Sequence, residues 1–82
     1  MGKHPINIAV LGSTGSIGAS ALEVITASGG ELCALALAAC SSTQLLLEQA
    51  QQFRPRWVVV TDAEAAARQD WDALPRETEL LV

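Results

Sequence analysis

Short runs of hydrophobic residues alternate along the chain with stretches of helical periodicity. Residues 6–11 (INIAVL) are rich in β-branched side chains and run directly into a glycine, which predicts a buried parallel strand. In residues 16–27 apolar positions recur at helical spacing, and a Ser-Gly-Gly sequence follows, which predicts a helix and its end. Residues 32–39 are almost wholly apolar and predict a second buried strand.

The same alternation continues through the second half of the chain. A cluster of capping residues at 41–43 precedes an amphipathic stretch that Pro55 ends, which predicts a second helix. Further on, the pattern predicts a strand over 57–61, a helix over 63–71 capped by Asp62, and the start of a strand over 79–82.

The order β-α-β-α-β-α-β, with short connections and no internal repeat, is typical of an α/β fold with a Rossmann-type doubly wound parallel sheet. At 82 residues the chain is small for such a domain, so we expect residues 1–82 to be its N-terminal part. A strand ending at Val82 would leave an open apolar edge, so we expect the protein to continue beyond it.

A glycine-rich loop of spacing G-x-x-G-x-x-G joins the first predicted strand to the first predicted helix. Backbone N–H groups converging at a helix N-terminus bind phosphate, and glycines let the chain come close to it. Gly12 suits the tight turn, Gly15 the approach of the backbone to a pyrophosphate, and Gly18 close packing of the helix. The alternative to a phosphate-binding loop is a simple strand-to-helix turn. The candidate dinucleotide-binding residues of the loop are Gly12, Ser13, Thr14, Gly15, Ser16, Ile17 and Gly18.

The end of the second predicted strand indicates which dinucleotide is bound. NAD sites place an acidic side chain there for the ribose hydroxyls, whereas this chain has Cys40, Ser41 and Ser42. Because no carboxylate is present to repel a 2′-phosphate, NADP is favoured over NAD. Two roles stay open for the serines: they contact the adenosine phosphate, or they only cap the helix that follows.

Composition excludes several classes of protein. Five basic against nine acidic residues and a net charge of −4 argue against a nucleic-acid partner. No apolar run has the roughly 18 to 20 residues that span a bilayer, and no secretory signal is visible, so we expect a cytoplasmic protein without a membrane partner. Cys33 and Cys40 are expected to be small buried thiols, and His4, in the N-terminal leader, has no neighbours with which to bind a metal.

Residues 11–18 (LGSTGSIG), followed by ALEVI at 21–25, resemble the start of 1-deoxy-D-xylulose 5-phosphate reductoisomerases. The similarity extends through Glu48 and Gln49 to the segment around Pro55. The resemblance implies an NADPH-binding part, in which residues 14–17 contact the cofactor and Gly12 and Gly18 shape the loop. Where that family has a glycine and polar or basic residues after the second strand, this chain has Cys-Ser-Ser at 40–42.

The resemblance also implies the chemistry of the intact enzyme. Such enzymes rearrange and reduce deoxyxylulose phosphate, a phosphorylated sugar, to methylerythritol phosphate in non-mevalonate isoprenoid biosynthesis. They use NADPH and a divalent metal, Mg or Mn, and the intact enzyme is expected to be a homodimer. The metal and catalytic residues are expected outside this chain, so residues 1–82 alone are not expected to be catalytic. The alternatives are another NADP-dependent reductase with a G-x-x-G-x-x-G loop, or a non-catalytic NADP-sensing regulator.

Overall fold

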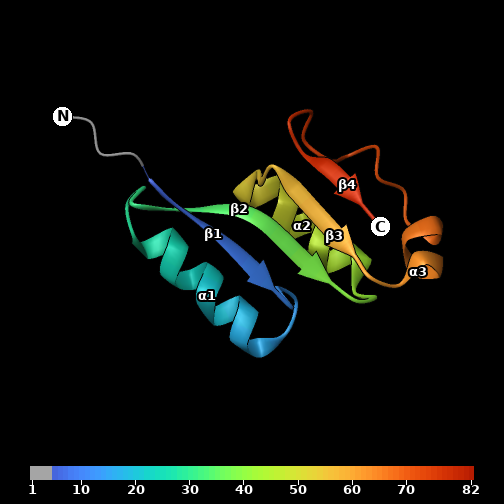
Figure 1. Ribbon diagram of the computed structural model, residues 1–82, viewed down its shortest axis with the longest axis horizontal. Coiled ribbons are helices and arrows are strands. Elements are labelled where there is room, and N and C mark those ends of the chain that lie inside the picture. Colours follow the sequence, from blue (N-terminus) through green and yellow to red (C-terminus); the bar gives the residue numbers. More distant parts are fainter. Residues whose placement is uncertain (1–4) are drawn as a thin grey trace.

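The computed structural model describes residues 5–82 (Figure 1). Strands and helices alternate in the predicted order, and the first three elements have the predicted bounds, whereas α3 ends three residues before 71 and the last two strands each end one residue early. His4 lies outside the described residues. The elements are β1 (Ile6–Leu11), α1 (Ser16–Ala27), β2 (Leu32–Ala39), α2 (Thr43–Phe53), β3 (Trp57–Val60), α3 (Ala63–Arg68) and β4 (Glu79–Leu81).

The four strands form one parallel sheet in the order β1-β2-β3-β4 (Figure 1). Because crossovers between parallel strands are right-handed, an order without reversal places the connecting helices on one face of the sheet. The structure thus confirms the Rossmann-like α/β class, and within residues 5–82 the strand order does not reverse. None of the helices in this part of the chain is long and apolar enough to cross a membrane.

One hydrophobic cluster joins the helices to the covered face of the sheet. Its side chains come from all three helices and from the inward positions of the strands. Leu37 of β2, Leu46 of α2, and Val58 and Val60 of β3 have no exposed surface. The two central strands are therefore held rigidly, and their carboxyl ends are fixed relative to each other.

The other face of the sheet is partly open in residues 5–82, and two predictions fail there. The strand at 6–11 was expected to be buried, but it is the edge strand and only Val10 is buried. Cys33 and Cys40 were expected to be buried, but both are exposed free thiols. For the edge strand and Cys33 the physical reason is the same, since apolar composition indicates a strand but does not show on which side a second layer covers it. Cys40 lies beyond the end of β2, in the segment that leaves the sheet.

The two tryptophans are packing residues. Trp71 lies against the hydrophobic cluster, and its indole Nε1 donates a hydrogen bond to the Ala66 carbonyl at 2.9 Å. The half-buried ring of Trp57 carries the Arg56 guanidinium 5.0 Å from its centroid. Both rings thus stabilise the C-terminal half of the sheet.

The predicted stop at Pro55 is confirmed, because α2 ends at Phe53 and Arg54 adopts a left-handed φ of 49°. Pro55 is fully buried, and its carbonyl accepts a hydrogen bond from the Thr78 hydroxyl before β4. At the surface, Arg54 Nε donates to Glu77 Oε1 at 2.7 Å, and this hydrogen bond lowers the pKa of the Glu77 carboxyl. These contacts attach β4 to the turn that follows α2.

Asp62 caps α3 as predicted: its Oδ1 accepts from the amides of Glu64 and Ala65 at 3.0 and 3.3 Å. Replacing Asp62 by Ala should therefore cost about 1 kcal/mol of unfolding free energy. In the full-length protein, hydrogen exchange at these two amides should accelerate in Asp62→Ala and much less in Asp62→Asn. Asp72→Ala is the matched control, because no hydrogen bond of its exposed carboxyl is seen in residues 5–82. Equal effects of the two alanine variants would contradict the assignment.

Candidate functional site

The two candidate segments lie side by side at the carboxyl edge of the sheet. Leu11, at the end of β1, is paired with Ala38 of β2, and the Ser13 amide continues this ladder by donating to the Ala38 carbonyl at 2.9 Å. The glycine-rich loop and the segment 40–42 therefore leave the sheet as neighbours. This edge is where parallel α/β sheets bind their ligands.

The start of α1 has no cap from its own chain. Gly15 is the N-cap residue, and the structure shows neither a side-chain cap bond nor an acidic residue in the first turn of this helix. The Gly15 amide donates to the Gly12 carbonyl at 3.0 Å, but in residues 5–82 the amides of Ser16 and Ile17 find no acceptor. Unpaired amides at the positive end of a helix dipole favour an anion.

The three glycines of the loop differ in what requires them. Gly12 has φ +69°, a left-handed conformation that glycine adopts at the least cost. A Cβ on Gly18 would overlap the Gly12 carbonyl and lie 2.6 Å from the Ser13 Cα, so glycine is needed for α1 to touch the loop. A Cβ on Gly15 would meet nothing closer than the Gly12 oxygen at 3.5 Å. Nothing in the described fold therefore requires glycine at position 15.

Ser13 is directed into the protein and is fully buried. Its hydroxyl donates to Gln49 Oε1 at 2.8 Å, and Gln49 Nε2 donates to the Ser13 carbonyl at 2.8 Å. The glycine spacing placed Ser13 among the candidate dinucleotide-binding residues and gave Gln49 no part in the loop. The signal was a glutamine on the buried face of α2, next to Ala50 and one turn from Leu46.

The segment after β2 is exposed at Cys40, Ser41 and Ser42. Ser42 is the N-cap residue of α2, but its hydroxyl makes no capping bond. Side-chain capping, one of the two predicted roles of these serines, is therefore not realised at Ser42. The Cys40 carbonyl accepts from the Asp62 amide at 3.1 Å, which fixes the path of the backbone while the side chains stay open to a ligand.

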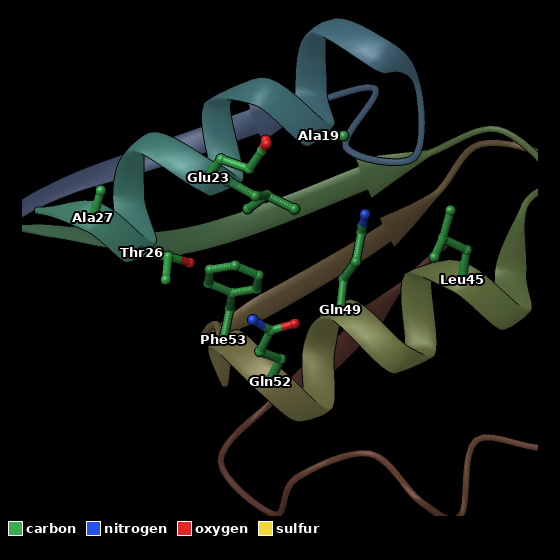
Figure 2. A pocket seen from close by; sticks show the side chains of 9 residues that line it. Ala19, Glu23, Thr26, Ala27, Leu45, Gln49, Gln52 and Phe53 are labelled. Atoms are coloured by element: carbon green, nitrogen blue, oxygen red, sulfur yellow. The ribbon is translucent and has the colours of Figure 1, made fainter.

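A groove lies away from this edge. The groove, of about 460 Å³, runs between α1 and α2, and Figure 2 shows Phe53 and Gln49 reaching into it from α2. Its lining is mostly apolar and includes no residue of the loop before α1. Within residues 5–82, no group of three or more His, Cys, Asp and Glu side chains is placed to hold a metal ion.

A parallel β1-α1-β2 unit with a glycine-rich loop at its carboxyl edge defines a Rossmann-like α/β protein. The particular family follows from comparison with known sequences. The family model described as 1-deoxy-D-xylulose 5-phosphate reductoisomerase matches residues 8–80, and the chain belongs to this family.

Relatives carrying the name 1-deoxy-D-xylulose 5-phosphate reductoisomerase agree with this assignment. The protein of Symbiobacterium thermophilum is 53% identical over 60 residues, which are 73% of this chain and 16% of that protein. The protein of Elusimicrobium minutum is 43% identical over 75 residues, 92% of this chain and 19% of that protein. In Anaeromyxobacter sp., 47% identity extends over 74 residues, 90% of this chain and 19% of that protein. The chain thus spans less than a fifth of these relatives.

For Gly18→Ala, the close contact predicts a change in unfolding free energy of the opposite sign to that expected from helix propensity. Propensity alone would make Gly18→Ala stabilising by ~1 kcal/mol, whereas the overlap with the Gly12 carbonyl should make it destabilising by ~1–3 kcal/mol. Gly15→Ala, the matched control in the same loop, should change the unfolding free energy by no more than about 0.5 kcal/mol, since a poorer N-cap and a less flexible unfolded chain offset each other. Chemical denaturation of the full-length protein measures both. A stabilised Gly18→Ala variant would rule out the close approach.

Proposed function

We propose that residues 1–82 are the N-terminal part of the NADPH-binding domain of a 1-deoxy-D-xylulose 5-phosphate reductoisomerase. The observation that carries the proposal is the uncapped start of α1 beside Gly15. Asp62 satisfies such amides at α3, whereas α2, like α1, starts without a side-chain cap; α1 differs from α2 in having the glycine-rich loop before it. At α1 the acceptor is missing, and the glycine that the fold does not need leaves room for one. A dinucleotide pyrophosphate supplies both the charge and the acceptor oxygens.

Each loop residue then has a distinct role. Thr14, Ser16 and Ile17 offer backbone amides to the phosphates, Thr14 and Ser16 also offer hydroxyls, and Gly15 leaves the space for the phosphates. Ile17 is 87% exposed at the first turn of α1, an unusual position for a large apolar side chain, and we assign it to the nicotinamide side of the cofactor. Gly12 and Gly18 shape the loop, and the buried Ser13 holds it rather than contacting phosphate.

The segment after β2 supports NADPH over NADH. Ser41 and Ser42 are exposed, and neither the segment 40–42 nor the first turn of α1 contains a carboxylate. A 2′-phosphate can therefore approach without the repulsion that an acidic residue causes in NAD sites. We assign Cys40, Ser41 and Ser42 to the surroundings of the adenosine phosphate.

The remaining parts of the proposal concern the intact enzyme. Its substrate is a phosphorylated sugar, deoxyxylulose phosphate, which is rearranged and reduced to methylerythritol phosphate in non-mevalonate isoprenoid biosynthesis. We place the divalent Mg or Mn and the catalytic residues elsewhere in the protein. We further propose a cytoplasmic homodimer, and that residues 1–82 alone have no catalytic activity.

Gly15→Ala tests the cofactor site in the full-length protein. The added methyl fits the fold but occupies the space proposed for the pyrophosphate, so the NADPH dissociation constant should rise by about tenfold to a hundredfold, equivalent to ~1–3 kcal/mol. Fluorescence titration with NADPH measures this, and the melting temperature should hardly change. Ser20→Ala, an exposed change one turn along α1, is the control. Unchanged NADPH affinity in Gly15→Ala would remove the basis of the assignment.

The activity of the full-length protein separates the proposal from its alternatives. NADPH should be oxidised only when deoxyxylulose phosphate and Mg or Mn are both present, as followed by the loss of NADPH absorbance. NADPH binding without turnover would favour a sensing regulator. Oxidation without the sugar phosphate and metal would point to another reductase.

A further inference from the structure

The buried amide of Gln49 joins α2 to the glycine-rich loop across 36 positions of sequence. Both ends of the amide are used, because Oε1 accepts from the Ser13 hydroxyl and Nε2 donates to the Ser13 carbonyl, each at 2.8 Å. Ser13 is fully buried and Gln49 is 9% exposed. Figure 2 shows the Gln49 side chain rising from α2 toward the side of the groove where Ala19 lies. A paired, two-point contact of this kind fixes one loop conformation.

The carbonyl held by Gln49 belongs to the same peptide unit as the Thr14 amide. A peptide bond is planar and trans here, so its C=O and N–H point in opposite directions. With the Ser13 carbonyl turned toward α2, the Thr14 N–H must turn away from it. In residues 5–82 that amide has no acceptor. Gln49 therefore determines which way the first free amide of the loop points.

Other contacts do not replace this one. The Ser13 amide donates to Ala38 at 2.9 Å, which fixes the start of the loop but not the orientation of the next peptide. Gly12 and Gly15 flank the segment and are glycines, the residues with the widest choice of backbone conformation. Without a donor for the Ser13 carbonyl, rotation of the peptide toward water would relieve a buried unpaired oxygen.

We propose that Gln49 is a positioning residue for the cofactor: by holding the Ser13 carbonyl inward it aims the Thr14 amide outward at the dinucleotide phosphate. The inference rests on the proposed function, since that function supplies the phosphate. Gln49 touches no cofactor atom in this arrangement. It raises the fraction of protein whose loop is ready to bind, and the apparent dissociation constant varies inversely with that fraction.

The two hydrogen bonds can be separated by substitution in the full-length protein. Gln49→Leu removes both hydrogen bonds. If about a tenth of the molecules then keep the loop in the binding conformation, the NADPH dissociation constant should rise by about tenfold. Ser13→Ala removes the hydroxyl bond but leaves Nε2 on the Ser13 carbonyl, so the dissociation constant should stay within about twofold while the melting temperature falls. A role in stability alone would instead make affinity follow melting temperature in both variants.

Two controls and one conservative variant complete the set. Gln52→Leu places the same change one turn along α2 at an exposed site, and Ile25→Val mildly loosens the core at the far end of α1; neither should alter NADPH affinity. In Q49E the ionised carboxylate cannot donate to the Ser13 carbonyl, but the protonated form can. The affinity of Q49E, relative to the unsubstituted protein at the same pH, should therefore recover as the pH is lowered.

Amide hydrogen exchange, measured without any ligand, tests whether Gln49 orders the loop independently of the proposed function. Exchange at Ser13 and Gly15 should accelerate in Gln49→Leu and not in Gln52→Leu. If the unsubstituted protein fails to bind NADPH, the proposed function is wrong, and the exchange data still decide whether Gln49 orders the loop. If Gln49→Leu binds NADPH normally, or exchanges these amides at the normal rate, the positioning role is overturned. Should Gln49→Leu not fold, the positioning role is tested by the other two variants. It is overturned if the NADPH affinity of Ser13→Ala falls with its melting temperature, or if the affinity of Q49E does not recover at low pH.

Discussion

The carboxyl edge of this sheet depends on how closely the start of α1 approaches the loop that follows β1. Gly18 lies against the backbone of Gly12 and Ser13, where no Cβ could fit. Because a helix is rigid, this single contact sets where its first amides lie relative to the end of β1. The left-handed turn at Gly12 is the other half of the constraint, since it returns the chain quickly enough for the contact to form. Removing either feature would move the positive end of the helix dipole away from the edge.

The rest of the fold supplies the frame for that contact. β2 and β3 are the central strands, and their inward side chains are among the most buried in the described chain. α2 packs over them, with Leu46 in the core, and carries Gln49 to the loop on the same face. The two hydrogen bonds to Ser13 thus connect the first βα unit to the second. A local turn between β1 and α1 is in this way tied to tertiary packing that forms only when β2 and α2 are in place.

Periodicity in the sequence predicts the elements well because it reports local facts. The bounds of β1, α1 and β2 follow from the pattern of apolar residues, with glycines after β1 and α1, and Asp62 and Pro55 mark a helix start and a helix end by their own chemistry. The exposure of Cys33 and of the β1 edge could not be predicted in this way. It depends on strand order and on which face the helices cover, which are properties of the assembled sheet.

In the candidate site, too, the local features were predictable from the sequence and the long-range ones were not. The glycine spacing predicts the loop, but the inward turn of Ser13 depends on Gln49, 36 positions away, and no pattern within the loop encodes it. The hydroxyl of Ser42 was open to two roles, and only the geometry showed that it makes no capping bond. A polar residue on the buried face of an amphipathic helix was the one signal available, and it indicates a buried hydrogen bond without naming the partner.

The proposed place of the ligand is supported by what the fold itself explains and by what it leaves unexplained. Gly12 and Gly18 are accounted for by backbone conformation and packing, and Ser13 by its hydrogen bonds. The uncapped helix start at Gly15 and the exposed Ile17 have no such account within the described residues. Departures from local rules concentrate at functional sites, because there the missing partner is a ligand. An Asp at position 15, like Asp62 at α3, would satisfy the amides of α1, but it would also place a carboxylate where we propose that a phosphate binds. The absence of that cap is therefore the feature most closely tied to the proposed cofactor.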